Sequence, residues 1–121
     1  MNKPAGRRVL IADDNRDAAE SLAMLLQMEG HEVSVAQDGP EAVILFAQVQ
    51  PEYAILDIGM PGLNGYEVAR RMRRDARGRT LHLIAVTGWG QQADKELAFA
   101  AGFDHHFTKP LEPDKLIALL K

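Results

Sequence analysis

Five polar side chains stand where short apolar runs of this sequence end, and their types could serve metal binding or group transfer. They are three carboxylates, a hydroxyl and an amine: Asp13, Asp14, Asp57, Thr87 and Lys109. If the apolar runs are parallel strands of one sheet, their carboxyl ends lie along the edge where such sheets bind ligands. The five side chains would then converge on one pocket, although they are far apart in the sequence.

Such a pocket favours a divalent cation and a phosphoryl group. Three carboxylates repel one another by roughly 4 kcal/mol per pair at about 4 Å and an effective dielectric constant near 20, and Lys109 offsets only one charge. A divalent cation would neutralise the others, and hard carboxylate oxygens suit Mg²⁺. The Lys109 amine and the Thr87 hydroxyl are suitable donors to phosphate oxygens. Asp57 is left as the candidate nucleophile, whose attack on phosphorus would give an acyl phosphate.

The elements that would position these side chains alternate along the chain. Short aliphatic or β-branched runs predict strands at 9–12, 32–36, 53–56, 81–86 and 105–108. Apolar residues at helical spacing predict a helix after each strand: one that Gly30 ends, one from Pro40 to about Gln48, one that carries Val68 and Met72, one that Gly102 closes, and one with Pro113 in its first turn.

Five repeats of strand and helix predict an α/β fold, in which a doubly wound parallel sheet of five strands has helices on both faces. The sequence contains no internal repeat, low-complexity tract or linker. We therefore expect a single domain over residues 1–121, with a core that spans about 8–121.

Composition limits the classes of function. The chain has 121 residues, the usual length of one domain, and a net charge of −3. It has no cysteine, which excludes disulfides, a thiol nucleophile and a cysteine-based zinc site. It also lacks a signal-peptide core and any apolar stretch of about 18 residues. We expect a soluble cytoplasmic protein without a membrane segment and without direct binding to nucleic acid, since a phosphate backbone calls for a basic face.

The candidate residues and their neighbours resemble the receiver domain of bacterial two-component response regulators. The resemblance rests on the pair Asp13-Asp14, on Asp57 with Met60-Pro61 and Gly65 after it, on Thr87-Gly88, and on Lys109-Pro110. It covers essentially the whole chain and keeps the order of the family's motifs. The family implies a flavodoxin-like three-layer sandwich with the strand order 2-1-3-4-5.

The resemblance also implies a role in a phosphorelay. Asp57 would accept a phosphoryl group from a phosphohistidine on a sensor histidine kinase or a histidine phosphotransfer protein. Asp14, Asp57 and the backbone carbonyl of Gly59 would ligate Mg²⁺, and Asp13 would act largely through water. Such a domain is regulatory and not an enzyme that turns over substrate, since it catalyses only its own phosphorylation and dephosphorylation.

The family's switch residues are implied in the same way. Thr87 and Lys109 would hold the phosphoryl oxygens, and Thr87 would move on phosphorylation together with His106. The family usually has Tyr or Phe at the position of His106, so this chain departs from the pattern there. The segments 87–91 and 102–106 look most like receivers fused behind sensor histidine kinases. The resemblance also allows a homodimer that forms on phosphorylation.

Three other functions are compatible with parts of the pattern. A Mg²⁺-dependent aspartyl-phosphate hydrolase would use Asp57 as its nucleophile, but such enzymes commonly have a second Asp two residues later, where this chain has Gly59. A flavodoxin-like flavin-binding module would need a phosphate loop rich in Ser, Thr or Gly in place of residues 13–15. A degenerate receiver that acts only as a scaffold is the third, and the intact set of candidate residues argues against it.

Two other clusters favour plain structural roles. Six arginines between residues 70 and 79 fit a solvated helix face better than a docking surface for an acidic partner. His105 and His106 are neighbours in a predicted strand, so their side chains point to opposite faces and a metal shared between them is not expected.

Overall fold

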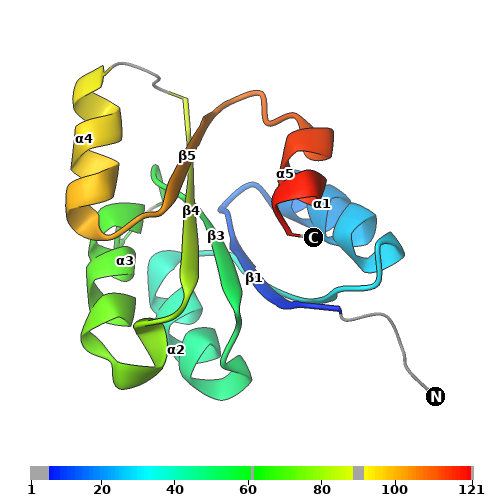
Figure 1. Cartoon of the computed structure of the whole chain (residues 1–121), viewed down its shortest axis with the longest axis horizontal. Coiled ribbons are helices and arrows are strands. Elements are labelled where there is room, and N and C mark those ends of the chain that lie inside the picture. The colour runs from blue at the N-terminus through cyan, green and yellow to red at the C-terminus, as the bar shows by residue number, and fades with distance from the viewer. Residues whose placement is uncertain (1–5, 61, 89–91, 121) are drawn as a thin grey trace.

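The structure of the chain is a computed structural model, and it describes residues 6–60, 62–88 and 92–120 (Figure 1). Within these residues, strands alternate with α-helices as the sequence predicts. In chain order the elements are β1 (Arg8–Ala12), α1 (Arg16–Met28), β2 (Glu32–Ala36), α2 (Gly39–Val49), β3 (Tyr53–Asp57), α3 (Gly65–Arg74), the short 3-10 helix η1 (Ala76–Gly78), β4 (His82–Thr87), α4 (Gln92–Ala101), β5 (His105–Thr108) and α5 (Pro113–Leu119).

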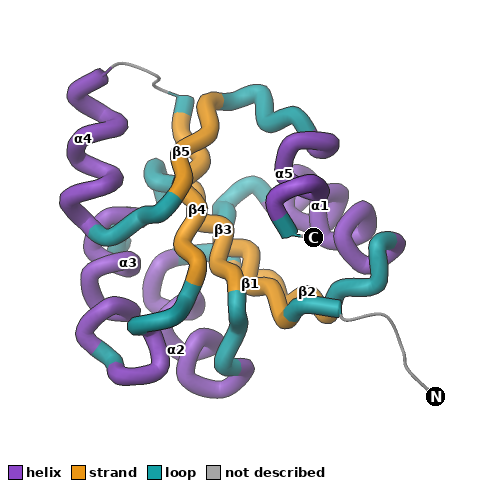
Figure 2. The backbone as a smooth tube through the Cα atoms, viewed as in Figure 1, coloured by secondary structure: helices purple, strands orange, loops and turns teal. Residues whose placement is uncertain are grey.

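The strands of the described chain form one parallel sheet in the order β2-β1-β3-β4-β5. This confirms the predicted fold class and strand order. The register places Ala12 of β1 beside Ala36 of β2 on one side and Leu56 of β3 on the other. Because all the pairings are parallel, the carboxyl ends of the strands lie along one edge of the sheet (Figure 2).

Helices cover both faces of this sheet: α1 and α5 lie on one face, and α2, α3 and α4 on the other (Figures 1 and 2). The strands feed two hydrophobic cores by alternation, since successive side chains point to opposite faces. Leu10 and Ala54 belong to the core beneath α2, α3 and α4, whereas Val9 and Ile55 belong to the core beneath α1 and α5. Every residue of β3 is buried, as expected for a central strand covered on both faces.

Polar side chains fix the starts of the helices that follow the strand ends. Asn15, Asp38 and Asn64 each precede a helix, and each side-chain oxygen accepts a hydrogen bond from a backbone N–H in the first turn, at 3.0, 2.8 and 3.1 Å. These bonds satisfy donors that a helix leaves without a partner. The chain is thereby turned sharply from each strand into its helix, so that the intervening loops stay near the carboxyl edge of the sheet.

The observed bounds differ from the predicted ones mainly by one or two residues. The fourth strand runs to Thr87 instead of Val86, so Thr87 pairs with Thr108 of β5. Residues 61 and 89–91 lie outside the described residues, and with them lie Pro61 of the family motif and most of segment 87–91. No helix in the described parts of the chain has the length and apolar character needed to cross a membrane.

Candidate functional site

The three predicted carboxylates come together at the carboxyl edge of the sheet. Asp13 and Asp14 follow β1, and Asp57 ends the neighbouring strand β3. One carboxylate oxygen from each residue lies within 4.8 Å of the others. Asp57 is buried at 7% relative exposure, Asp13 is half-buried and Asp14 is exposed. The cluster is therefore open to solvent on one side and buried on the other, an arrangement that leaves room for a cation with bound water.

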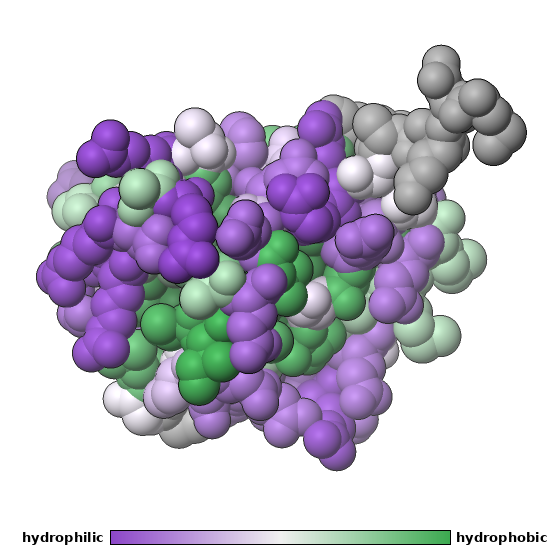
Figure 3. All heavy atoms as spheres, turned by 90° about the horizontal axis from the view of Figure 1, so that it is seen from below, coloured by the Kyte–Doolittle hydropathy of each residue, from purple (hydrophilic) through white to green (hydrophobic). Residues whose placement is uncertain are grey.

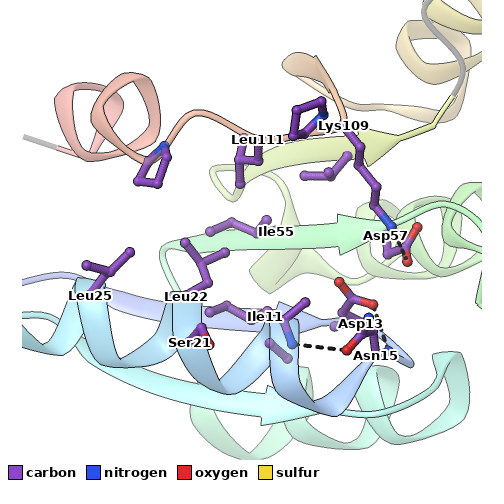
Figure 4. Close-up of a pocket in the computed structure, with 16 residues that line it drawn as sticks. Ile11, Asp13, Asn15, Ser21, Leu22, Leu25, Ile55, Asp57, Lys109 and Leu111 are labelled. Atoms are coloured by element: carbon purple, nitrogen blue, oxygen red, sulfur yellow. Dashed lines mark hydrogen bonds and ion pairs between the residues drawn. The ribbon is translucent and has the colours of Figure 1, made fainter.

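Lys109 reaches the same cluster from the loop after β5 (Figure 4). Its ammonium group lies 3.0 Å from Oδ2 of Asp57, while Oδ1 of Asp57 accepts a hydrogen bond of 3.1 Å from the Gly59 backbone N–H. The nearby carboxylates raise the pKa of Lys109, although burial acts in the opposite direction. Lys109 therefore stays protonated at neutral pH, and its ammonium group forms a charge-assisted hydrogen bond with the Asp57 carboxylate.

The pKa of Asp13 reflects its burial and the nearby negative charge. Burial and the proximity of Asp57 raise the pKa of the Asp13 carboxyl from 3.8 to about 6, although a hydrogen bond of 2.9 Å from the Asn15 backbone N–H lowers it. A cation at this point would relieve the repulsion that contributes to the shift. Oxygen donors of this number and charge fit Mg²⁺ well and a soft metal poorly.

Thr87 is placed beside Asp57 by the sheet itself. Asp57 pairs with Val86 in the register of β3 and β4, so Thr87 comes one residue further along the adjacent strand. Thr87 is 1% exposed, and its carbonyl oxygen accepts a hydrogen bond of 2.8 Å from the Lys109 backbone N–H. Backbone pairing therefore holds Thr87, Lys109 and Asp57 near one another at the carboxyl edge of the sheet.

Gly65 has a steric role that the sequence motif alone did not explain. Its backbone N–H donates to the Ile58 carbonyl at 3.1 Å, which closes the loop between β3 and α3. A Cβ atom at Gly65 would lie 2.8 Å from Cα of Ile58 and 3.0 Å from the Asp57 carbonyl oxygen. Only glycine fits so close to the backbone of Asp57.

His106 occupies the predicted switch position on β5, beside Ala85 of β4. Its side chain is half-buried, and within the described residues neither ring nitrogen has a hydrogen-bond partner. Burial lowers the pKa of His106 below 6.5, and the positive charge of Lys95 on α4 lowers it further, against the opposing effect of Asp94. The imidazole is therefore neutral at neutral pH and behaves as a mainly apolar ring.

Sequence reasoning missed a cavity of about 620 Å³ that opens beside these residues. Asp57, Asp13 and Lys109 line one end, and the cavity continues between α1 and the loop before α5 (Figure 4). There it is lined by apolar side chains, among them Leu22 and Leu25 of α1. The exposed Leu25, with Met24 and Met28, leaves an apolar stripe along α1 that helical spacing could have revealed.

Comparison with known proteins agrees with the fold. A family model for the response regulator receiver domain matches residues 9–121. Among curated relatives, protein PilH of Pseudomonas aeruginosa is 34% identical over 110 residues, which make up 91% of this chain and 91% of PilH. Several other curated relatives are longer, and the chain spans 47 to 51% of the length of three of them.

Solved structures give the same picture. Vibrio cholerae chemotaxis protein CheY4 superposes with a TM-score of 0.90 at 27% identity, over 96% of this chain and 97% of CheY4. The receiver domain of sensor histidine kinase PA1611 from Pseudomonas aeruginosa superposes with a TM-score of 0.86 at 28% identity, over 96% and 95% of the two chains. That domain was solved with a magnesium ion coordinated in its active site cleft.

Proposed function

Since this chain belongs to the response regulator receiver domain family, we propose that it is a phosphoacceptor signalling domain in which Asp57 carries the phosphoryl group. The observation that carries this proposal is the position of Asp57 beside Lys109 and the two other carboxylates. Among the carboxylates that the structure describes, Asp57 alone combines burial, an ammonium at 3.0 Å and a location at the end of a cavity that a donor could enter.

The donor set of the site fits Mg²⁺. Asp14, Asp57 and the backbone carbonyl of Gly59 would hold the ion, with Asp13 acting through water, and the clustering of the three carboxylates supports this assignment. When bound, Mg²⁺ would offset the negative charge of the carboxylates and of the phosphoryl oxygens. Without a cation, the same carboxylates would repel a phosphoryl donor.

The transfer itself needs one nucleophile and positioned donors. An Oδ atom of Asp57 forms a bond to phosphorus while the P–N bond of a phosphohistidine breaks, and the electron pair returns to the imidazole nitrogen of the donor, which takes a proton from water. The Lys109 ammonium and the Thr87 hydroxyl then donate to the phosphoryl oxygens. Because Lys109 is already held at Asp57, little reorganisation is needed when the charge arrives.

The phosphoryl donor would be a phosphohistidine on a sensor histidine kinase or on a histidine phosphotransfer protein, as the family implies. The apolar cavity along α1 leads directly to Asp57, and its exposed neighbours Met24 and Met28 would give a partner helix an apolar surface to cover. Such partners place the protein in the cytoplasm. The output would follow from movement of Thr87 and of the neutral His106 ring, which lie on adjacent strands.

Phosphorylation by a small donor tests the proposal directly. Incubation with acetyl phosphate and Mg²⁺ should add one acid-labile phosphoryl group, which intact-mass measurement detects. Asp57→Asn should abolish the added mass, whereas the control Asp114→Asn, at an exposed residue of α5, should leave it unchanged. Labelling that survives in Asp57→Asn, or no labelling of the folded wild type, would contradict the proposal and favour a scaffold that is not phosphorylated.

A further inference from the structure

A second cavity lies at the opposite end of the sheet from Asp57, at the amino ends of the central strands. This amino-end cavity has a volume of about 490 Å³, a size typical of small-molecule sites. It is lined by Arg7, Arg8, residues 50–53, Arg77 and residues 80–82. Figure 3 views the molecule from below Figure 1, the side on which β3 and β4 begin. Hydrophilic side chains cover most of that face, with hydrophobic atoms exposed between them.

Positive charge dominates this cavity. Three arginines line it, and Glu52 is the one carboxylate among the described lining residues. Arg77 is paired with Asp75 at 2.7 Å, so Arg7 and Arg8 supply most of the positive charge that an anion would meet.

The Nη1 atoms of Arg7 and Arg8 lie 3.8 and 3.9 Å from the Glu52 carboxylate, beyond hydrogen-bond distance. The Arg8 backbone N–H donates a hydrogen bond of 3.1 Å to Glu52 Oε1, and the Arg7 Nε donates one of 3.3 Å to the Leu120 carbonyl. The Arg8 side chain is held in place by a hydrogen bond of 3.0 Å from Nε to the Gln50 carbonyl. The terminal amino groups of Arg8 therefore lie near the Glu52 carboxylate without a short hydrogen bond to it. A phosphate group, which has more oxygens, could accept hydrogen bonds from them at shorter distance.

An aromatic stack adjoins the arginines. Tyr53 and His82 face each other across β3 and β4, with ring centroids 4.5 Å apart and planes 16° from parallel. Tyr53 is buried and His82 is exposed, so Tyr53 covers one side of the imidazole and solvent reaches the rest. The Arg7 guanidinium lies 5.9 Å from the centre of the Tyr53 ring. The cavity thus combines guanidinium groups with a flat ring against which another aromatic ring could stack.

The charge distribution of the whole chain favours anions at this end. Residues 66–80, which form most of α3 and all of η1, contain six arginines and two carboxylates and carry +4. The chain carries −3, so its remaining residues carry −7. The three clustered carboxylates belong to that remainder and lie at the other edge of the sheet. Such a separation draws small anions toward the basic end and away from the acidic one.

We propose that the amino-end cavity binds a nucleotide. The phosphate groups lie at the guanidinium groups of Arg7 and Arg8, and the base lies against His82, which Tyr53 holds by stacking. The fork of an arginine matches phosphate oxygens in a bidentate manner, whereas the aromatic stack selects for a ring that inorganic phosphate lacks. The site is separate from Asp57, so a nucleotide and a phosphoryl group on Asp57 can be bound together.

Titration calorimetry and amide chemical shifts test this with ADP as the probe, in buffer with chelator so that no Mg²⁺ can draw phosphate to the carboxylates. We expect saturable binding, with shifts at residues 7–8, 50–53 and 77–82. Pyrophosphate and adenosine should each bind more weakly than ADP, because each supplies only half of the contacts. Arg8→Gln and His82→Ala should each weaken ADP binding by roughly tenfold.

Arg70→Gln is the matched control for charge. Arg70 is exposed on α3 within the same basic segment, but it does not line the cavity. It should change ADP affinity by less than about twofold, since only the long-range field is altered. Shifts centred on Asp57 and Lys109, equal losses in Arg70→Gln and Arg8→Gln, or no saturable ADP binding below about 1 mM would each overturn the proposal.

Discussion

The Lys109 ammonium lies 3.0 Å from Oδ2 of Asp57, and the two side chains differ greatly in exposure, at 44% for Lys109 and 8% for Asp57. The pair therefore joins a buried carboxylate to an amine that solvent still reaches. A buried charge is tolerated only with a partner, whereas an exposed amine loses little when it stands alone. Loss of Lys109 would therefore destabilise the fold mainly because the buried Asp57 carboxylate would be left without its charged partner.

Lys109→Gln should destabilise the fold when Mg²⁺ is absent. The substitution removes the charge that offsets Asp57 and the other carboxylates, so we expect the free energy of unfolding to fall by about 1–3 kcal/mol. Urea unfolding in the presence of chelator measures the loss. Lys115→Gln is the matched control, because its ion pair with Glu112 is exposed on both sides and should contribute less than about 1 kcal/mol. Equal effects of the two substitutions would show that Asp57 does not need Lys109.

Mg²⁺ should stabilise the folded chain through the carboxylate cluster. A ligand that binds only the folded state adds about 2.7 kcal/mol at one hundred times its dissociation constant. Thermal melts with Mg²⁺ and with chelator should therefore separate. Asp14→Ala should bring the two melts together, whereas Asp114→Ala, remote in sequence and exposed, should keep them apart. Melts of the wild type that coincide would count against a metal site at these residues.

Gly65→Ala should damage the loop that carries Asp57. The new Cβ would lie 2.8 Å from Cα of Ile58, so the backbone must shift, and overpacking of this kind costs typically about 1–3 kcal/mol. The same substitution at Gly59 is the control, because a Cβ there would meet only Oδ1 of Asp57, at 3.8 Å. Urea unfolding should show a loss of stability in Gly65→Ala and nearly normal stability in Gly59→Ala, and phosphorylation by acetyl phosphate should be impaired in Gly65→Ala. Normal stability of Gly65→Ala would mean that the loop relaxes easily.

The site was predictable from the sequence because its parts obey a rule of backbone geometry. Parallel strands bring their carboxyl ends to one edge, and the strand order implied by the family resemblance sets β3 beside β4, so Asp57 and Thr87 were expected to lie near each other. The pairing of Asp57 with Val86 confirms this placement at the level of single residues. The roles of these residues in phosphoryl transfer remain predictions that the experiments above test.

Side-chain contacts made across helices were not predictable in this way. Arg73 falls within the run of arginines assigned to a solvated face, and for this residue the assignment is wrong. Its guanidinium donates to the carbonyls of Gly78, Leu81 and Gly102 at 2.6–3.0 Å and pairs with Asp104 at 2.8 Å. The sequence offers no feature that distinguishes Arg73 from the other arginines of this run. Only the packing of α3 against its neighbours brings the Arg73 guanidinium to these acceptors.

His106 gives the last prediction, because its environment opposes protonation. The ring is half-buried, the described residues give its nitrogens no hydrogen-bond partner, and Lys95 adds repulsion that Asp94 only partly offsets. The pKa of His106 in the folded chain is therefore lower than the 6.5 expected in the unfolded chain. Below pH 6.5 the unfolded chain binds more protons at this residue than the folded chain, so acid favours unfolding.

His106→Phe should remove this contribution while keeping a ring of similar size. We expect the wild type to lose stability relative to the variant as the pH falls from about 7.5 to about 5.5, measured by urea unfolding with chelator. The Asp13 carboxyl changes the stability in the opposite direction, because its raised pKa of about 6 lets the folded chain gain a proton in this pH range. Asp13 is present in both proteins, so its contribution cancels in the comparison. Parallel curves for wild type and His106→Phe would show that His106 titrates alike in the folded and unfolded chains.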